Sequence, residues 1–517
     1  MKHGKIGWQL AVPLLAIVAI SVVSMPAVAQ MTSVGISCSQ ISALHLLQQD
    51  NMRAGRALVE CGVLPAGGSN KAGDAEDQAP APPNVLVSNR SCSSQSSCTK
   101  SESMVWGNGN TVVVNYNDHT GGLNYSGLSV SDDGGATFTE IIPPPLSTGH
   151  GDNFGDPIVV WNAKLGKWFA GDLADGCGGQ GIALWTSTDG HTWTPGACAH
   201  NNSGDDRESF WVDNEPASAF YGRMYISWND FNFGGGALSV THSDDGINWS
   251  SPVHATNGFI RDVQVTGTPP GVIRSSSIAK NTVFVAAMDE GGGGFNTRQN
   301  TMFRSTDGGA SFTSSSMGPR FAATGDVSCG YFVAVAPIIR HMGWGQPAVG
   351  PRNVVHYAYS GAGSSGDHGD IFYVRSADNG LTWSNPIEVN QDTDAQFKTQ
   401  WMPSVSTDKD GKVTISWYDR RQATSACNVA TDAGCRYERW ARQSADNGAT
   451  FQSEFVVSSS LIDQPEQDDP GVQSCYAGDY DYNTTQGGNA YITWTDGRRA
   501  VNGHHVQDVN FASVPLP

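Results

Sequence analysis

The stretch SADNGLTW, Ser376–Trp383, decides the fold, because the chain returns to nearly the same residues as SADNGATF at Ser444–Phe451. The motif reads Ser-x-Asp-x-Gly-x-Thr/Ser-aromatic, and a variant of it is one residue shorter. The other copies are SDDGGATF (Ser131–Phe138), STDGHTW (Ser187–Trp193), SDDGINW (Ser243–Trp249) and STDGGASF (Ser305–Phe312). Six copies in a chain of 517 residues indicate one structural module, repeated with loops of variable length.

The motif has the composition of a tight turn. Ser and Asp side chains accept hydrogen bonds from turn amides, and Gly adopts the positive φ that other residues resist. A run typical of a β-strand precedes each copy, as in IFYVRS before the turn that begins at Ser376. We therefore expect a hairpin turn between two strands, anchored in the core by its aromatic residue. The aspartates of the motif are expected to be structural and not catalytic.

A second pattern lies upstream of the turns, where runs rich in β-branched and aromatic residues end in a polar residue. Six runs end in Asp; they are VVVNYND, WFAGD, MYISWND, VFVAAMD, VTISWYD and AYITWTD, ending at Asp118, Asp172, Asp230, Asp289, Asp419 and Asp496. A seventh run, VVHYAYS, ends at Ser360. The strand-like runs therefore indicate seven modules, one more than the turn motif does.

The last module is too short to contain all its strands. Only PLP remains after DVNFASV (Asp508–Val514), which corresponds to DIFYVRS (Asp370–Ser376). The segment NVLVSN, Asn84–Asn89, has strand character and precedes the first module. We expect it to pair beside Asp508–Val514 and close a ring, because closure removes an exposed sheet edge. The predicted fold class is all-β, a β-propeller with seven four-stranded blades, or six if one module is irregular.

Two segments precede the predicted propeller, which spans residues 83–517. Residues 1–29 have a positive start, an apolar core and the small residues AVA before Gln30, which is typical of an export signal. Residues 30–82 are expected to form a small helical region followed by a linker rich in Pro, Gly and Ala. The predicted location is therefore outside the cytoplasm, with no membrane-spanning segment after signal cleavage.

The net charge argues against one class of partner, and the cysteine content predicts disulfides. A net charge of −19 argues against nucleic acid, whose phosphates require a basic surface. The ten cysteines favour disulfides in an oxidising compartment. Spacing favours Cys38–Cys61, Cys92–Cys98, Cys177–Cys198 and Cys427–Cys435, which leaves Cys329 with Cys475, although spacing alone does not fix the connectivity.

Six such motifs, known as Asp boxes, in a β-rich acidic chain with an export signal resemble the sialidase superfamily of propellers. The resemblance covers about residues 84–517. It implies a substrate carboxylate held by three arginines, a Tyr nucleophile assisted by a Glu, and an Asp as acid/base. Asp boxes also occur in propellers that bind glycans or proteins, so the resemblance indicates the fold more strongly than the chemistry.

Arginines directly behind two strand ends are the candidates for carboxylate binding. WYDRR contains Arg421 and WTDGRR contains Arg499, and equivalent positions in adjacent blades are expected to bring both guanidinium groups to one face. Guanidinium binds carboxylates in a bidentate geometry. The alternative is that each arginine pairs with an aspartate of its own blade. Arg207 and Arg261 are candidates for the third arginine, and Trp401 for stacking on a sugar or only on its neighbours.

Candidate catalytic residues lie on loops at the same end of the predicted blades. Tyr480, in AGDYDYN, is the candidate nucleophile, with Tyr482 as its alternative. Glu208 or Glu290 is the expected base beside it, and Asp156, in GHGDNFGDP, is the expected acid/base. Simple aromatic packing is the alternative role for the tyrosines.

The strand-end aspartates raise the question of a cation. Carboxylates around one axis repel each other unless they are paired or bind cations. We expect each to cap its own loop, with Ca²⁺ at the channel mouth as the alternative and no other cofactor. The sequence thus leaves two main functions open: a secreted sialidase-like hydrolase of terminal acidic sugars, and a non-catalytic propeller that binds glycans or a cell-surface protein.

Overall fold

The computed structural model describes residues 30–68, 84–88, 92, 94–120, 124–142, 144–271, 282–335, 339–363, 366–393, 396–428 and 432–517. The predicted export signal and most of the predicted linker lie outside these residues. None of the helices in the described ranges is long and apolar enough to cross a membrane.

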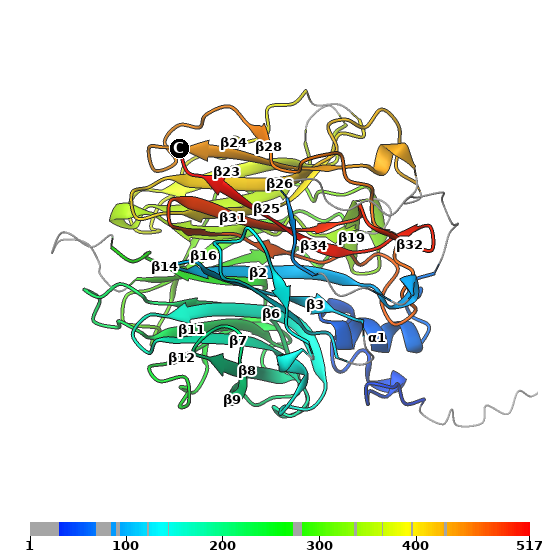
Figure 1. Cartoon of the computed structure of the whole chain (residues 1–517), viewed down its shortest axis with the longest axis horizontal. Coiled ribbons are helices and arrows are strands. Elements are labelled where there is room, and N and C mark those ends of the chain that lie inside the picture. Colours follow the sequence, from blue (N-terminus) through cyan, green and yellow to red (C-terminus); the bar gives the residue numbers. More distant parts are fainter. Residues whose placement is uncertain are drawn as a thin grey trace, which may run out of the picture.

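Most of the described chain forms seven antiparallel sheets (Figure 1), six of which contain four strands in sequence order. The first three are β2 (Lys100–Asn108), β3 (Thr111–Asp118), β4 (Gly127–Ser131) and β5 (Thr139–Glu140); β6 (Asn153–Asn162), β7 (Lys167–Ala174), β8 (Gly181–Ser187) and β9 (Thr194–His200); and β10 (Asp205–Val212), β11 (Met224–Asp230), β12 (Ala237–Ser243) and β13 (Val253–Phe259). The next three are β14 (Arg261–Gly267), β15 (Val283–Asp289), β16 (Gln299–Ser305) and β17 (Thr313–Ser316); β21 (Gln346–Val349), β22 (Val355–Gly361), β23 (Asp370–Ser376) and β24 (Ile387–Glu388); and β25 (Gln400–Thr407), β26 (Val413–Asp419), β27 (Glu438–Ser444) and β28 (Phe455–Val456).

The seventh sheet joins the two ends of the propeller sequence. Its strands are β30 (Thr484–Gln486), β31 (Asn489–Asp496), β34 (Asp508–Pro515) and β1 (Val85–Leu86). Val85 pairs with Phe511 and Leu86 with Asn510. The predicted pairing of the 84–89 segment with the last strand is therefore confirmed for its described residues.

The first strands of the sheets contact one another in a cyclic order. β2 contacts β6, β6 contacts β10, and the series continues through β14, β21 and β25 to β30, which contacts β2. The short strand β29 (Asp481–Tyr482) also runs parallel to β2. The predicted all-β class with four-stranded sheets is confirmed, and we interpret the seven sheets as the blades of a propeller.

The repeated motif forms the same turn in all six copies. In the copy at β23, the Ser376 hydroxyl donates to Asp378 (2.7 Å) and accepts from the Gly380 amide (2.8 Å). Asp378 accepts from the Thr382 amide (2.9 Å) and hydroxyl (2.5 Å). The Ser-to-Asp hydrogen bond recurs in the other five copies. These aspartates are thus structural, as predicted, and we call the six features the Ser-Asp turns.

The Ser-Asp turns and the strand-end aspartates lie at opposite ends of the sheets. Ser444 pairs with Val413, the first residue of β26, whereas Asp419, the last residue of β26, pairs with Glu438. The first strands begin at the same end as these aspartates, since Lys100 pairs with Asp118. We refer to the turn end and the aspartate end of the propeller.

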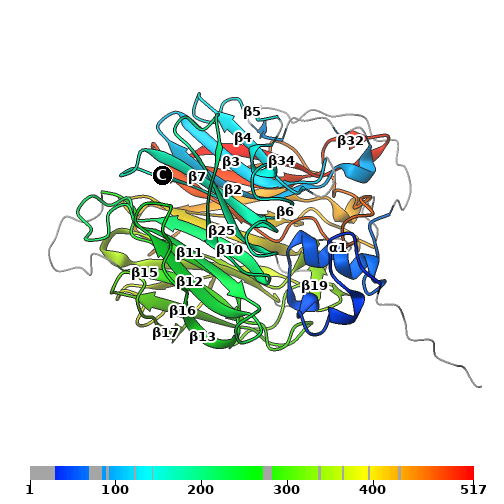
Figure 2. The ribbon, with the colours of Figure 1, turned by 90° about the horizontal axis from the view of Figure 1, so that it is seen from below.

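The segment 30–68 lies against the aspartate end, where Figure 2 shows it in blue beside the sheets. It contains the helix α1 (Met52–Glu60) and the 3-10 turns η1 (Cys38–Gln40) and η2 (Leu46–Gln48). Asn51 caps α1, because its side chain accepts from the Ala54 amide (2.9 Å). The predicted helical region is therefore present.

The remaining elements are short. A three-stranded sheet, β18 (Val327–Cys329), β19 (Phe332–Val335) and β20 (Ile339–His341), lies between the fourth and fifth sheets in the sequence, and β32 (Ala500–Val501) pairs with β33 (His504–His505). The 3-10 turns outside the N-terminal segment are η3 (Gln95–Ser97), η4 (Pro145–Ser147), η5 (Pro351–Asn353) and η6 (Ala433–Cys435).

All ten cysteines form disulfides, with the connectivity that spacing favoured: Cys38–Cys61, Cys92–Cys98, Cys177–Cys198, Cys329–Cys475 and Cys427–Cys435. Five disulfides are typical of proteins that fold in an oxidising, extracytoplasmic compartment.

Candidate active site

The same backbone irregularity recurs in the first strands at the aspartate end of the channel. In five sheets the first strand contains a register shift, and a residue other than glycine adopts a positive φ there. These residues are Glu102 (48°), Asp156 (63°), Arg207 (58°), Asp262 (60°) and Met402 (49°). The conformation costs about 1–3 kcal/mol per residue and clusters at functional sites. Four of the five side chains are ionisable and buried, so the feature gathers charge at one place.

Three buried arginines converge on the carboxyl group or main chain of Asp50. Arg207 Nη1 lies 3.2 Å from Asp50 Oδ2, and Arg261 Nη1 lies 2.9 Å from Asp50 Oδ1. Arg340, on β20, donates to the main-chain carbonyl of Asp50. Burial raises the pKa of Asp50, but the charges of Arg261, Arg207 and Arg340 outweigh it, and the pKa lies below its ordinary value. The three arginines therefore form an anion site, which we call the arginine trio.

Each arginine of the trio is also held by a carboxylate of the propeller. Arg207 Nη2 lies 2.8 Å from Asp262, and Arg261 Nη1 lies 2.9 Å from Asp206. Arg340 Nε donates to Asp479 (2.8 Å). Because these pairs fix the guanidinium planes, the trio is organised by the propeller itself as well as by Asp50.

Two stacked tyrosines border the trio. The rings of Tyr480 and Tyr482 are 4.5 Å apart and nearly parallel, and the Arg207 guanidinium lies 4.5 Å from the centre of the Tyr480 ring. Within the described chain the Tyr480 hydroxyl has no hydrogen-bond partner. Burial raises the pKa of Tyr480, and the carboxylates of Glu102 and Asp156 raise it further. A phenol in this setting holds its proton until a neighbouring base removes it.

The carboxyl groups near Tyr480 are tuned toward the protonated form. Burial raises the pKa of Glu102, and the charges of Asp479 and Asp156 add to the effect. Burial also raises the pKa of Asp156, as do Asp206 and Asp50, although its Oδ2 accepts from the Arg207 amide (2.7 Å). A carboxyl group with a raised pKa is suited to act as a general acid.

The structure brings four of the seven predicted site residues to this cluster. Tyr480, Asp156 and Arg261 are in it, and Glu208 follows Arg207 directly on β10. Burial raises the pKa of Glu208, and Asp156, Asp172 and Asp205 are the groups whose charges affect it. Glu290, the alternative base, accepts from the Trp344 indole (2.7 Å). Glu102 is the glutamate whose charge contributes most to the raised pKa of Tyr480.

The expected convergence of Arg421 and Arg499 is wrong. Arg421 binds Asp419 (2.6 Å) and Glu454, and Arg499 binds Asp508 (2.5 Å). Each guanidinium thus satisfies carboxylates of its own sheet, which is the alternative that the sequence left open. The reason is topological: second-strand ends lie outward of the first strands, and the first strands surround the centre.

The Trp401 side chain has no exposed surface on which a sugar could stack. Its side chain is fully buried, stacks on Tyr418 (5.4 Å between ring centres) and is covered by the Arg420 guanidinium (5.0 Å). The residue therefore stacks on its neighbours alone, the second of its two expected roles.

Five of the strand-end aspartates cap their own loops, as expected. In each, a carboxylate oxygen accepts from the amide two residues later, at 2.7–2.9 Å; these are Asp118, Asp230, Asp289, Asp419 and Asp496. Asp172 accepts instead from the side chains of Asn153 (2.6 Å) and Asn115 (3.3 Å). The strand-end aspartates are thus held by hydrogen bonds within the described chain.

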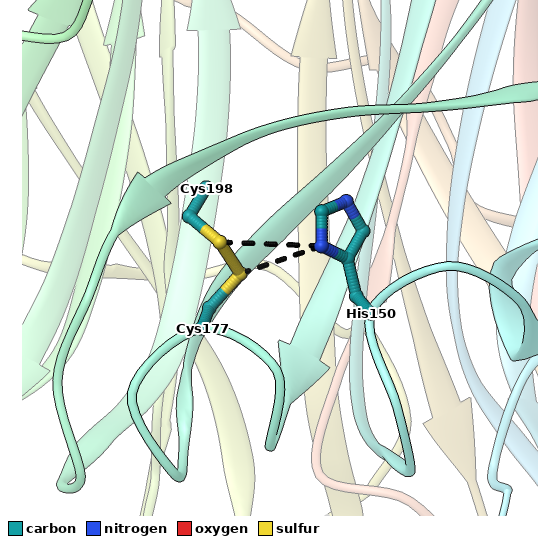
Figure 3. A group of neighbouring side chains, drawn as sticks. All are labelled: His150, Cys177 and Cys198. Carbon is teal, nitrogen blue, oxygen red and sulfur yellow. Dashed lines mark hydrogen bonds between the residues drawn. A yellow bond between two sulfur atoms is a disulfide. The ribbon is translucent and has the colours of Figure 1, made fainter.

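Two further groups of the described chain have ligand-type side chains close together. His150 lies beside Cys177 and Cys198 (Figure 3), but the two sulfurs are bonded to each other and are not thiolate ligands. His504 Nδ1 lies 2.9 Å from Asp468 and 3.2 Å from Glu466, so the imidazole occupies the space between those carboxylates.

A cavity of about 320 Å³ occupies the channel on the side of the turn end. Aromatic residues line it, including Trp106, Trp161, Trp211 and Tyr482, together with amide side chains such as Gln264. Its lining contains no charged residue of the described chain. The channel thus has an uncharged aromatic half and, beneath the segment 30–68, a charged half.

Sequence reasoning missed Asp50, Arg340, Glu102, Asp206, Asp262 and Asp479. Alignment of the first strands would have pointed to three of them, because Glu102 in SES and Asp262 in IRD occupy the position of Arg207 in DDRE, and Asp206 directly precedes that position. Asp50 and Arg340 lie outside the repeats, in the N-terminal segment and on β20. No pattern in the sequence links those two residues to the blades.

No family model and no curated protein matches the chain. Solved structures with a similar chain path include the α-L-arabinofuranosidase Arb93A from Fusarium graminearum, with 14% identity, a TM-score of 0.40 and coverage of 67% of this chain and 93% of that one. They also include the ulvan lyase of family PL25 (11%, 0.41, covering 86% and 96%) and the phage phi92 endosialidase (10%, 0.41, covering 84% and 69%). Similarity at this level assigns this chain neither an activity nor a substrate.

Proposed function

We propose that the protein is a secreted glycoside hydrolase that removes terminal acidic sugars, in the manner of a sialidase. The observation that carries the proposal is the arginine trio, in which Arg207 and Arg261 bind the Asp50 carboxylate and Arg340 binds the main-chain carbonyl of the same residue. A sugar carboxylate has the same charge and geometry as the Asp50 side chain, and guanidinium groups are the strongest protein partners for it.

The neighbours of the trio supply the remaining chemistry. The Tyr480 oxygen attacks the anomeric carbon while the ionised form of Glu102, whose raised pKa makes its carboxylate a stronger base, takes the phenolic proton, and the glycosidic C–O bond breaks. Asp156 gives its proton to the departing oxygen. Water then attacks the tyrosyl-linked sugar, Asp156 takes a proton from that water, and the phenol recovers its proton from Glu102. The raised pKa of Asp156 supports its role as the acid.

The test is hydrolysis of 4-methylumbelliferyl N-acetylneuraminide and of the corresponding glucuronide. We expect Arg261→Lys, which keeps the charge but loses the planar fork, to lower kcat/KM about tenfold or more. Arg442→Lys is the matched control, because Arg442 is a partly buried arginine on β27 that donates to the Gln452 carbonyl (2.6 Å) and the Val389 carbonyl (2.8 Å), and not to any partner of the trio named above. No turnover by wild type and by Asp50→Asn on either substrate would refute the proposal.

A non-catalytic glycan-binding propeller is the second candidate. The uncharged aromatic cavity favours it, because sugar rings combine apolar faces with hydroxyls that amide side chains bind. The same assay separates the candidates. Binding of neutral oligosaccharides without turnover on any acidic or neutral glycoside would favour this second function.

A further inference from the structure

The N-terminal segment 30–68 contacts the propeller directly over the arginine trio. Asp206 accepts from the amides of Asp50 and Asn51 (both 3.2 Å) and from the Asn51 side chain (2.6 Å). Gln180 donates to Gln49 (3.0 Å). The residues around Asp50 are thus held by specific polar contacts, and Asp50 itself is 2% exposed.

Further contacts hold the middle and the C-terminal end of the segment. Arg53 donates to the Gly179 carbonyl (2.8 Å), and Met52 lies in an apolar cluster with Tyr125, Val472 and Tyr476. The amide of Gly67 donates to the Val472 carbonyl (3.0 Å). Gly67 is also closely packed, because a Cβ atom there would lie 2.3 Å from the Asp469 carbonyl oxygen. The segment therefore packs closely against the propeller and covers the trio.

We propose that this segment is a built-in competitor, whose Asp50 carboxylate occupies the position of a substrate carboxylate. The inference rests on the proposed function, since it takes the trio as the substrate anion site. Asp50 makes the two contacts that a substrate carboxylate requires, one to Arg207 and one to Arg261. The segment also contacts the trio through the Asp50 carbonyl, which accepts from Arg340, and it contacts Asp206, the partner of Arg261. The mimicry concerns the Asp50 carboxylate, and these contacts hold it in place.

The physical consequence is a lowered apparent affinity for acidic ligands. A tethered group has an effective concentration on the order of millimolar or more, and a free ligand must displace it. The apparent Kd equals the intrinsic Kd divided by the fraction of molecules in which the site is open. Replacement of Asp50 by Asn removes the negative charge that pairs with Arg207 and Arg261. The segment then binds the propeller less strongly, so the fraction of molecules with an open site increases.

The experiment measures binding of N-acetylneuraminic acid and of glucuronic acid by calorimetry to three forms of the full chain. Asp50→Asn is expected to bind one of these acids at least about tenfold more tightly than wild type. Glu60→Gln is the control: Glu60 lies on the same segment but pairs with Arg56 (2.6 Å), away from the trio. Equal affinity of Asp50→Asn and wild type would overturn the proposal.

A second measurement covers the case in which Asp50→Asn does not fold. Hydrogen exchange of wild type is followed over α1, with and without saturating N-acetylneuraminic acid. Displacement of the segment predicts at least about fivefold faster exchange of the α1 amides when the sugar is bound. Binding without any change in α1 exchange would overturn the proposal.

The two proposals fail in different ways. If Asp50→Asn binds an acidic sugar more tightly but hydrolyses neither glycoside, the proposal of a built-in competitor stands and the proposal of a hydrolase is refuted. If wild type hydrolyses the sialoside with the same kcat/KM as Asp50→Asn, the proposal of a hydrolase stands and the proposal of a built-in competitor is refuted.

Discussion

Arg207 has a left-handed backbone and a fully buried guanidinium, and both follow from its place in a bulge. The register shift between Asp206 and Ser209 inserts an unpaired residue into β10. The bulge turns that residue toward the centre of the molecule, where Asp50 and Asp262 bind its side chain. Two charged partners compensate both the burial of the charge and the backbone cost.

The role of the Tyr480 hydroxyl as nucleophile can be tested by a substitution that removes a single oxygen atom. We expect Tyr480→Phe to lower sialoside kcat about a thousandfold or more, because the nucleophile is lost. The melting temperature should stay within about 1 °C, since the hydroxyl has no hydrogen-bond partner in the described chain to lose.

The control for this substitution is Tyr357→Phe. Tyr357 is another buried tyrosine, and it takes no part in the proposed reaction. Its activity should equal that of wild type. A Tyr480→Phe protein with undiminished turnover would remove the tyrosine from the mechanism.

The Ser-Asp turns were predictable as elements because each depends on residues within one octapeptide. The Ser, Asp and Gly of each copy bind one another, so their sequence contains the whole turn. The pairing of β1 with β34 was predictable for a related reason: a missing strand and an unassigned strand were both visible in the sequence.

The site was less predictable than the fold. The trio combines β10 and β14 with β20, which lies in a small sheet outside the repeated pattern. Its anion comes from a fourth element, the N-terminal segment. Such convergence depends on how elements pack in space, and the arginines that the sequence made conspicuous, Arg421 and Arg499, bind carboxylates of their own sheets instead.

The turns also predict how the protein responds to acid. Hydrogen bonds from Thr137 and Ser131 lower the pKa of Asp133 to about 2, and the Thr192 and His191 amides act in the same way on Asp189. Since the folded-state pKa lies below the unfolded value of 3.8, the ionised turns stabilise the fold above about pH 4. That stability is lost as the pH falls toward 2.

The measurement is urea unfolding between pH 5 and pH 2. We expect the midpoint to fall steeply below pH 4 in wild type. A variant with Asp133→Asn and Asp189→Asn should be less stable at pH 5 and show a shallower decline, because two of the titrating turns are removed. Parallel curves for the two proteins would show that the turns do not set the acid response.

On the scale of the molecule, the disulfide Cys329–Cys475 joins distant parts of the chain at the site. It links β18 to the loop that carries Asp479, across a sequence separation of 146 residues. The same small sheet supplies Arg340, so the bridge ties both partners of the Arg340–Asp479 pair together. We therefore expect it to matter for stability and for the arginine trio alike.

Replacement of both cysteines by serine tests this expectation. The chain-entropy estimate for a loop of this size is about 5 kcal/mol, against about 2 kcal/mol for a six-residue loop. The control is thus the double serine variant of Cys92–Cys98, whose separation is 6 residues. We expect the Cys329/Cys475 variant to lose clearly more free energy of unfolding than the control, and to bind acidic sugars more weakly in an Asp50→Asn background. Equal losses in the two variants would mean that the long bridge closes a part of the propeller that is already rigid.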